Sequence, residues 1–311
     1  MQPSNSPDTD STQARQRLIG IALMCAALVC FSCLDGIAKW LTPRVGMIET
    51  TWARYISSVV LVSLALNPWT QPGLTLTRKP WMQVARSLLL FASTILNFMG
   101  LQYLQLTQTM SIIFLAPLVV ALISGPLLGE WVGPRRMVAI AVGFIGVLVV
   151  TRPGFGHVHP AALYSLAGMF CYAFFVILTR VLARHDSSAT TMFYSGLGGL
   201  LILTPIVPFF WRNPETPMIT FFMVLVGVFG ALGHWLMILA YRRASTATLS
   251  PFIYTQIVWM ILIGYVVFED VPDFWTLVGA AIVIASGLYL LHREHVTGRA
   301  ITATADPENR A

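Results

Sequence analysis

Residues 219–240 read ITFFMVLVGVFGALGHWLMILA and contain no Asp, Glu, Lys or Arg. An α-helix of this length is roughly 30 Å long, which matches the hydrocarbon core of a bilayer. Nine further apolar stretches have a similar length, and together they cover most of the chain. We therefore expect ten transmembrane helices, at 18–41, 48–67, 80–101, 107–128, 135–151, 161–182, 190–211, 219–240, 247–268 and 275–292.

The composition of the chain agrees with a protein embedded in a membrane. Hydrophobic residues make up 56% of the sequence and charged residues 10%, whereas a soluble domain carries about 25% charged residues. Helices are expected because lipid offers no hydrogen-bond partners to an open strand edge, and the alternating pattern of a lipid-facing barrel is absent. The expected fold is an all-α integral membrane protein, without room for a soluble catalytic domain.

The formal charge of +6 is distributed unevenly along the chain. If the ten helices alternate in direction, most basic residues outside them fall on one side of the membrane. Loops on the opposite side carry only Arg44, Arg152 and Arg212, together with several acidic residues. The positive-inside rule then places both termini in the cytoplasm. The residues on the expected cytoplasmic side are Arg15, Arg17, Arg78, Lys79, Arg135, Arg136, Arg180, Arg184, Arg242, Arg243, Arg293 and Arg299.

The two ends of the chain are expected to form cytoplasmic tails, at 1–17 and 293–311. The first is rich in Ser, Thr, Pro, Asp and Gln and is expected to be disordered. The first apolar stretch is too long for the apolar region of a signal peptide and lacks a clear cleavage site, so we expect it to remain as a transmembrane helix. The expected location is the cytoplasmic (inner) membrane.

All four cysteines fall inside expected transmembrane helices, and two of them form a C-x-x-C pattern. That pattern can indicate a metal or redox site, but no second pair of ligands lies near it. Cysteine surrounded by lipid and apolar side chains behaves as a small hydrophobic residue. We therefore expect no metal and no cofactor at Cys25, Cys30, Cys33 and Cys171.

The two halves of the chain, 18–152 and 161–292, resemble each other. Tyr103 and the polar residues after it correspond to Tyr241 and the Ser-Thr segment that follows it, and Glu130 corresponds to Glu269. A unit of five helices crosses the membrane an odd number of times, so the second copy must be inverted. Inverted repeats build many secondary transporters, whose two halves open alternately around a central site.

The repeat favours transport over two other classes of function. An intramembrane enzyme would need a nucleophile beside a base or a set of metal ligands, and His234 has no convincing partner of this kind in the sequence. A membrane protein that only binds a partner is the third class. No G-x-x-x-x-G-K-[ST] loop is present, so ATP hydrolysis by that route is not expected. Protons or exchange are the expected source of coupling.

Several short motifs resemble one family of carriers. SIIFLAPL at 111–118, LGE at 128–130, GFIGV at 143–147, TRPG at 151–154 and AYRRAS at 240–245 are similar to the EamA group of the drug/metabolite transporter superfamily. The resemblance covers about 18–292. It implies a 5+5 inverted-repeat carrier whose central cavity is lined mainly by the first, third, fourth, sixth, eighth and ninth helices. The substrates of this group range from exported amino acids and drugs to imported vitamins and nucleoside-like metabolites.

The first two helices narrow the resemblance to a subgroup. The stretch FSCLDGIAKWL at 31–41, followed by Arg54 in the next helix, is similar to members that move riboflavin or S-adenosylmethionine. Related sequences are described as metallophore exporters. The expected function is therefore secondary transport of a vitamin or nucleoside-like metabolite, with export of amino acids, metallophores or drugs as the alternative.

Three ionisable residues lie in the first two expected helices. Ionised groups are costly in a bilayer and are candidates for function. Asp35 and Lys39 share one helix face, being four residues apart, and Arg54 is expected at a similar depth. One interpretation is an ion pair of Asp35 with Arg54 or Lys39, with Lys39 also reaching the interface. The other is a gate or a contact with a charged substrate group. The two cations argue against a proton site at Asp35.

Uncharged polar and aromatic residues complete the expected site. His234 is the one histidine well inside an expected helix, and it could bind a ligand, exchange a proton or only form a core hydrogen bond. An amide or an aromatic ring facing a cavity would suit a planar heterocycle or a zwitterion. The expected cavity residues are Asp35, Asn97, Tyr172, His234, Trp235, Tyr254, Gln256 and Trp259.

Two features of the fourth helix concern movement and assembly. Pro117 lies in its middle, and because proline bends helices and frees carbonyl groups, we expect a hinge there. The glycines Gly125 and Gly129 form a G-x-x-x-G pattern, which is typical of close helix packing or of a dimer contact. This pattern is compatible with a homodimer, and the sequence does not decide the oligomeric state.

Overall fold

The computed structural model describes residues 7–67, 72–116, 118–120, 122–123, 134–151, 159–182, 185–243, 249 and 252–304. Within these residues the chain forms helices and no strands, which confirms the expected all-α fold. The elements are α1 (Pro7–Val45), α2 (Met47–Leu66), the 3-10 helix η1 (Pro72–Leu74), α3 (Pro80–Leu101), α4 (Leu106–Ile113), α6 (Pro134–Thr151), α7 (Ala162–Leu182), α8 (Ser188–Leu203), α9 (Val207–Phe210), α10 (Pro217–Tyr241), α12 (Gln256–Phe268) and α13 (Phe274–Thr304).

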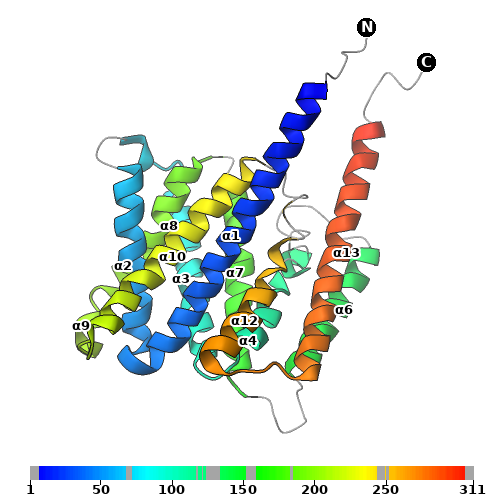
Figure 1. Ribbon diagram of the computed structural model, residues 1–311. Coiled ribbons are helices and arrows are strands. Elements are labelled where there is room, and N and C mark those ends of the chain that lie inside the picture. Colours follow the sequence, from blue (N-terminus) through cyan, green and yellow to red (C-terminus); the bar gives the residue numbers. More distant parts are fainter. Residues whose placement is uncertain are drawn as a thin grey trace.

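Four stretches are long and apolar enough by themselves to cross a membrane. They are Arg15–Val45, Pro80–Leu101, Ala162–Thr179 and Pro217–Ala240. Five of the other expected transmembrane stretches contain shorter apolar helices in their described parts. The remaining one, α2, has 20 residues and carries the charged side chains Glu49 and Arg54. The helices pack as one bundle, in which the start of α1 and the end of α13 lie on the same side (Figure 1).

Both terminal helices are longer than the sequence predicted. α1 begins at Pro7 and α13 continues to Thr304, so residues 7–17 and 293–304, which were expected to be tails, extend these helices. Once a helix has formed, each added residue gains a hydrogen bond without a new nucleation cost. Polar residues can therefore continue a transmembrane helix beyond the membrane.

Prolines set helix boundaries inside the bundle. The expected helix at 190–211 is divided into α8 and α9 by a turn at Thr204–Ile206, where Pro205 lacks the N–H group that a continuous helix needs. A turn at Phe114 and Leu115 interrupts the expected fourth helix. Pro117, the expected hinge, lies outside the described residues, as do Gly125 and Gly129.

The helices α3 and α10 begin alike, with Pro80 and Pro217 in their first turns. Proline suits this position because its missing N–H would have no partner there. At α10, the hydroxyl of Thr216 also accepts a hydrogen bond from the N–H of Ile219, at 3.4 Å. Asn97 and His234 lie equally far along the chain from these two prolines, so they occupy equivalent positions of the two helices.

Contacts between helices follow a pattern that exchanges the two halves of the chain. The contact of α1 with α10 corresponds to that of α7 with α3. The contact of α2 with α10 corresponds to that of α8 with α3, and the contact of α1 with α12 to that of α7 with α4. The pairs α2–α8, α4–α12 and α6–α13 join helices that are each other's counterparts. This pairing is what a two-fold relation between the halves produces. In Figure 1, α6 and α13 lie together at one edge of the bundle.

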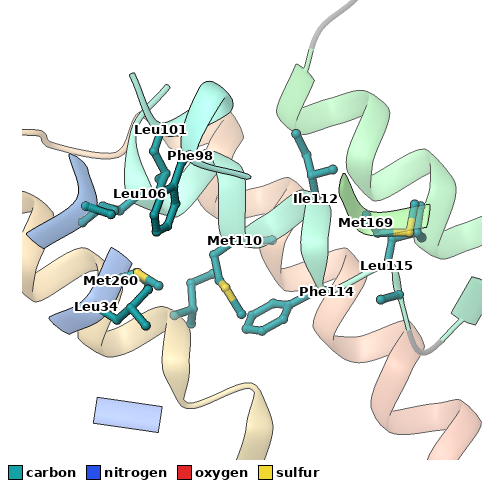
Figure 2. Packing of buried hydrophobic residues seen from close by; sticks show 14 of the residues in the cluster. Leu34, Phe98, Leu101, Leu106, Met110, Ile112, Phe114, Leu115, Met169 and Met260 are labelled. Carbon is teal, nitrogen blue, oxygen red and sulfur yellow. The ribbon is translucent and has the colours of Figure 1, made fainter. Parts of the chain in front are cut away.

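The centre of the bundle is apolar and draws on both halves. Side chains of α1, α3, α4, α7 and α12 meet there, and Phe114 and Leu115 of the turn after α4 join them (Figure 2). The short helix α4 contacts helices of both halves, so its residues pack between the two halves. The labelled members are Leu34, Phe98, Leu101, Leu106, Met110, Ile112, Phe114, Leu115, Met169 and Met260.

Glycines allow α10 to lie directly against α1 and α2. A Cβ atom at Gly227 would be 2.3 Å from the Cβ of Ser57 and 2.7 Å from the carbonyl oxygen of Arg54. A Cβ atom at Gly233 would be 2.7 Å from the ring of Phe31. Small residues allow this kind of close approach between membrane helices.

We expect Gly227→Ala to lower the thermal unfolding midpoint of the purified protein in detergent. Its new methyl group would meet the α2 backbone, which cannot move away as a side chain could, and overpacking of this kind costs about 1–3 kcal/mol. Gly264→Ala is the matched control, because its Cβ would lie 3.8 Å from the nearest atoms, in ordinary contact. Equal midpoints for both variants would contradict the close packing of α10 on α2.

Candidate functional site

A hydrogen bond between α1 and α3 lies at the centre of the predicted site. The Nδ2 group of Asn97 donates to Oδ1 of Asp35 over 3.1 Å. Because a carboxylate only accepts hydrogen bonds, Asn97 must turn its NH₂ group toward Asp35. The Oδ1 atom of Asn97 is buried and has no hydrogen-bond partner among the described residues.

Arg54 is held on α3 one turn away from Asn97. Its Nη1 group donates to the hydroxyl of Thr94 and, at 3.5 Å, to that of Tyr55. Its guanidinium carbon lies 6.0 Å from the ring centre of Phe98, within cation–π range. Arg54 is close enough to Asp35 for its charge to act on the carboxylate.

The expected ion pairs of Asp35 are not formed among the described residues. Lys39 instead pairs with Asp270, with 2.6 Å between Nζ and Oδ2. Two physical reasons account for the difference. Asp35 and Arg54 are each held by a polar partner on α3, and Lys39 lies one turn nearer the end of α1, where its long side chain reaches the α12–α13 loop.

The surroundings of Lys39 form a cluster that joins the two halves of the chain, which we call the Lys39 clasp. Besides Asp270, its Nζ donates to the carbonyl oxygen of Leu104 at 3.1 Å and lies 4.8 Å from the ring centre of Phe268. Lys39 and Leu104 belong to the first half, Phe268 and Asp270 to the second.

A second set of polar contacts joins the halves at the opposite end of the bundle, and we call it the Asp186 clasp. The carboxylate of Asp186 accepts hydrogen bonds from Thr77 Oγ1 at 2.5 Å, the Arg78 N–H at 3.0 Å and Gln83 Nε2 at 2.8 Å. These donors lie after α2 or in the first turns of α3, at the end of the bundle where α2 ends. The Lys39 clasp lies near the end of α1, which is at the opposite end of the bundle (Figure 1).

Arg86 is a functional candidate that the sequence reading missed. This arginine of α3 is 4% exposed. Its guanidinium donates to Thr179 Oγ1 at 2.6 Å, to the Thr191 carbonyl at 3.0 Å and to Ser195 Oγ at 2.9 Å. A basic residue inside the expected helix 80–101 was the available signal, since intramembrane charges are functional candidates by default.

His234 lies beside the Asp35 group. Its ring meets that of Phe31 edge-on, with 5.0 Å between the ring centres, and Phe31 lies one turn before Asp35 on α1. On the related side of the bundle, a Cβ at Gly168 of α7 would lie 3.5 Å from the backbone nitrogen of Asn97. The contact of Phe31 with His234 therefore corresponds to the contact of Gly168 with Asn97. Asp35 follows Phe31 by four residues and Tyr172 follows Gly168 by four residues, so Tyr172 is the counterpart of Asp35.

The remaining predicted residues have different neighbours. Tyr172 stacks on Phe175 with 5.7 Å between ring centres. Tyr254 meets Phe114 edge-on at 5.1 Å, and its hydroxyl, which lacks a partner among the described residues, is directed at Gly287 of α13. Gln256 is buried and Trp259 half-buried on α12, while Trp235 is exposed. The structure therefore brings together Asp35, Asn97, Arg54 and His234, and places Tyr254 apart from them.

An all-helical bundle of long apolar helices, with polar contacts between the helices and paired halves, is the architecture of a multi-pass membrane protein. The chain belongs to the EamA-like transporter family, whose model matches residues 18–152 and 159–292. This match confirms the resemblance that the sequence motifs indicated.

Individual relatives agree with the family. The S-adenosylmethionine uptake transporter of Rickettsia conorii is 27% identical over 278 residues, covering 89% of this chain and 94% of the relative. The riboflavin transporter of Vibrio cholerae is 26% identical over 284 residues, with the same two coverages. A solved crystal structure has a similar fold, with a TM-score of 0.60, 16% identity, and coverage of 86% of this chain and 94% of the other.

The Lys39 clasp predicts an energetic coupling that a double-mutant cycle can measure. We expect Lys39→Met and Asp270→Asn to interact by about 1 kcal/mol, the upper end for ion pairs that remain partly open to water. Their side chains are 15% and 26% exposed. The measurement is unfolding of the single and double variants in detergent. Arg44→Met combined with Asp270→Asn serves as the control and should be additive. Additive effects in the Lys39 cycle would contradict the pairing.

The Asp186 clasp predicts a component of stability that acid removes. Burial alone would raise the pKa of the Asp186 carboxyl group above its ordinary value of 3.8, but the three hydrogen bonds and the nearby charge of His185 outweigh burial and lower this pKa. A lowered pKa stabilises the folded state above pH 3.8, and this contribution disappears as the pH falls through the folded-state pKa.

Unfolding midpoints of the wild type and Asp186→Asn should therefore differ at neutral pH and converge as the pH falls below about 4. Glu215→Gln, at an exposed carboxylate outside the clasp, should show no such convergence. A constant difference between wild type and Asp186→Asn at every pH would show that the Asp186 charge is not what the clasp uses.

Proposed function

We propose that this transporter carries a small organic metabolite across the cytoplasmic membrane by alternating access, with both termini in the cytoplasm. The observation that carries the proposal is the pairing of helices across the two halves. The large contacts between the halves have counterparts with the halves exchanged, as in α1–α10 and α3–α7, α2–α10 and α3–α8, and α1–α12 and α4–α7. Two halves that are equivalent in packing can exchange their conformations, which moves the opening from one side of the central site to the other.

The two clasps suit the gates of such a cycle. Both cross from the first half to the second, and they lie at opposite ends of the bundle. Opening toward one side requires the contacts at that end to separate, while those at the other end hold the halves together. The basic residues Arg78 and Lys79, which lie at the Asp186 clasp, support a cytoplasmic location for this end through the positive-inside rule.

The polar group around Asp35 and the named relatives both support a class of substrate. Charged, amide and aromatic groups converge there in Asp35, Arg54, Asn97 and His234, which suits a polar molecule that carries a flat ring. Two relatives are named for S-adenosylmethionine and riboflavin. We propose a nucleoside-like or vitamin substrate of this kind, with protons or exchange as the source of coupling.

Uptake by reconstituted protein tests the proposal. Labelled S-adenosylmethionine and riboflavin are offered to proteoliposomes that contain the purified full chain, with and without a pH gradient, and to protein-free liposomes. We expect protein-dependent uptake of one compound that Asp35→Asn or His234→Ala lowers at least about tenfold, because each change removes a central polar contact.

Glu269→Gln, an exposed change at the end of α12, is the control variant and should transport like the wild type. Equal uptake with and without protein for both compounds, extended to amino acids and cationic drugs, would contradict the proposed function. Wild-type uptake by both central variants would contradict the proposed site.

A further inference from the structure

Asp35 and Arg54 present opposite charges side by side without joining them. Asp35 is held by Asn97, and Arg54 by Thr94, two residues of α3 that lie three positions apart on one helix face. Such residues are about 5–6 Å apart at their Cβ atoms. No ion pair connects the two charges within the described part of the chain. In a bilayer, unjoined charges are costly, so this arrangement favours a ligand that satisfies both.

The acceptors of this pair gather on one side. Asp35 uses one carboxylate oxygen for Asn97, and its other oxygen has no partner among the described residues. Asn97 adds its buried, unpartnered Oδ1. A carboxylate oxygen and an amide oxygen next to each other match the three N–H donors of an ammonium group.

The donors of the pair belong to Arg54. The contacts that the structure shows for its guanidinium use Nη1, which leaves Nε and Nη2 for another acceptor. Gly230 of α10 faces this edge, since a Cβ atom there would lie 3.8 Å from Nε, in ordinary contact. A planar guanidinium with open N–H groups matches a carboxylate.

We propose that this pair recognises the zwitterionic head group of an α-amino acid, with Asp35 and Asn97 binding the ammonium and Arg54 the carboxylate. The inference rests on the proposed function, which it sharpens by naming the chemical class of the substrate. A ligand with both charges leaves the site neutral, whereas a ligand with one charge would leave either Asp35 or Arg54 uncompensated. Phe31, one turn before Asp35 on α1, meets His234 edge-on, and such an aromatic pair suits a ring of the substrate next to the head group.

The assignment separates the two substrate types that the relatives suggest. S-Adenosylmethionine carries an amino-acid head group, whereas riboflavin is uncharged and has none. Arg86 does not blur the distinction, because its guanidinium is already engaged by three oxygens of α7 and α8.

Binding to the purified full chain in detergent, followed by calorimetry, tests the assignment with matched probes. S-Adenosylhomocysteine and 5′-methylthioadenosine share the adenosine thioether, and only the first carries the amino-acid head. We expect the first to bind at least about tenfold more tightly, because only its head group can form charge-assisted hydrogen bonds with Asp35 and Arg54. Asp35→Asn and Arg54→Gln should remove this preference and leave the affinity for 5′-methylthioadenosine unchanged. Arg44→Gln, an exposed arginine at the end of α1, is the matched control.

Several outcomes would overturn the assignment. Equal affinities for the two thioethers in the wild type would do so without any variant, and so would a preference that survives both substitutions. Binding and uptake of riboflavin with no binding of S-adenosylhomocysteine, methionine or phenylalanine would overturn the head-group assignment and leave the proposed transport function standing. Absence of uptake for every compound in proteoliposomes would instead remove the proposed function itself.

Discussion

The lack of water in a bilayer governs this structure, because polar groups surrounded by lipid depend on partners within the protein. Arg86 of α3 donates to α7 and α8, and Arg54 of α2 to α3. Asp35 of α1 accepts from α3. Each of these contacts costs the desolvation of its polar groups, and each joins helices that apolar packing alone would hold with less orientation. The polar contacts thus fix the level at which neighbouring helices meet.

The same constraint separates two kinds of contact within the bundle. Apolar faces of α1, α3, α4, α7 and α12 share the central cluster, and contacts between apolar side chains are not directional. Polar contacts are discrete, and they separate the bundle into states with a given set made or broken. The Lys39 clasp and the Asp186 clasp are such sets. Between them lie Asp35, Asn97, Arg54 and His234, where a ligand would meet both halves.

Particular residues show how far the sequence could predict this arrangement. The equivalent positions of Asn97 and His234 follow from the prolines that begin α3 and α10, and they are visible in the sequence. Arg86 was equally visible as a charge within an apolar stretch. The partner of Lys39 was not, because Asp270 is 231 residues away and the nearer Asp35 looked equally suitable. A pairing across the fold depends on which helices are neighbours, and local spacing does not contain that information.

The amino-acid sequence by itself determined the solvent, the helical class and the family, because apolar length and backbone satisfaction in lipid leave only helices. It also contained the ionisable residues that interrupt the apolar stretches. Tertiary structure decided their partners: Asp35 with Asn97, Arg54 with Thr94 and Lys39 with Asp270. The physical reason is that a charge in a membrane takes the partner that the packing of apolar helices brings within reach, and this packing is a property of the whole bundle.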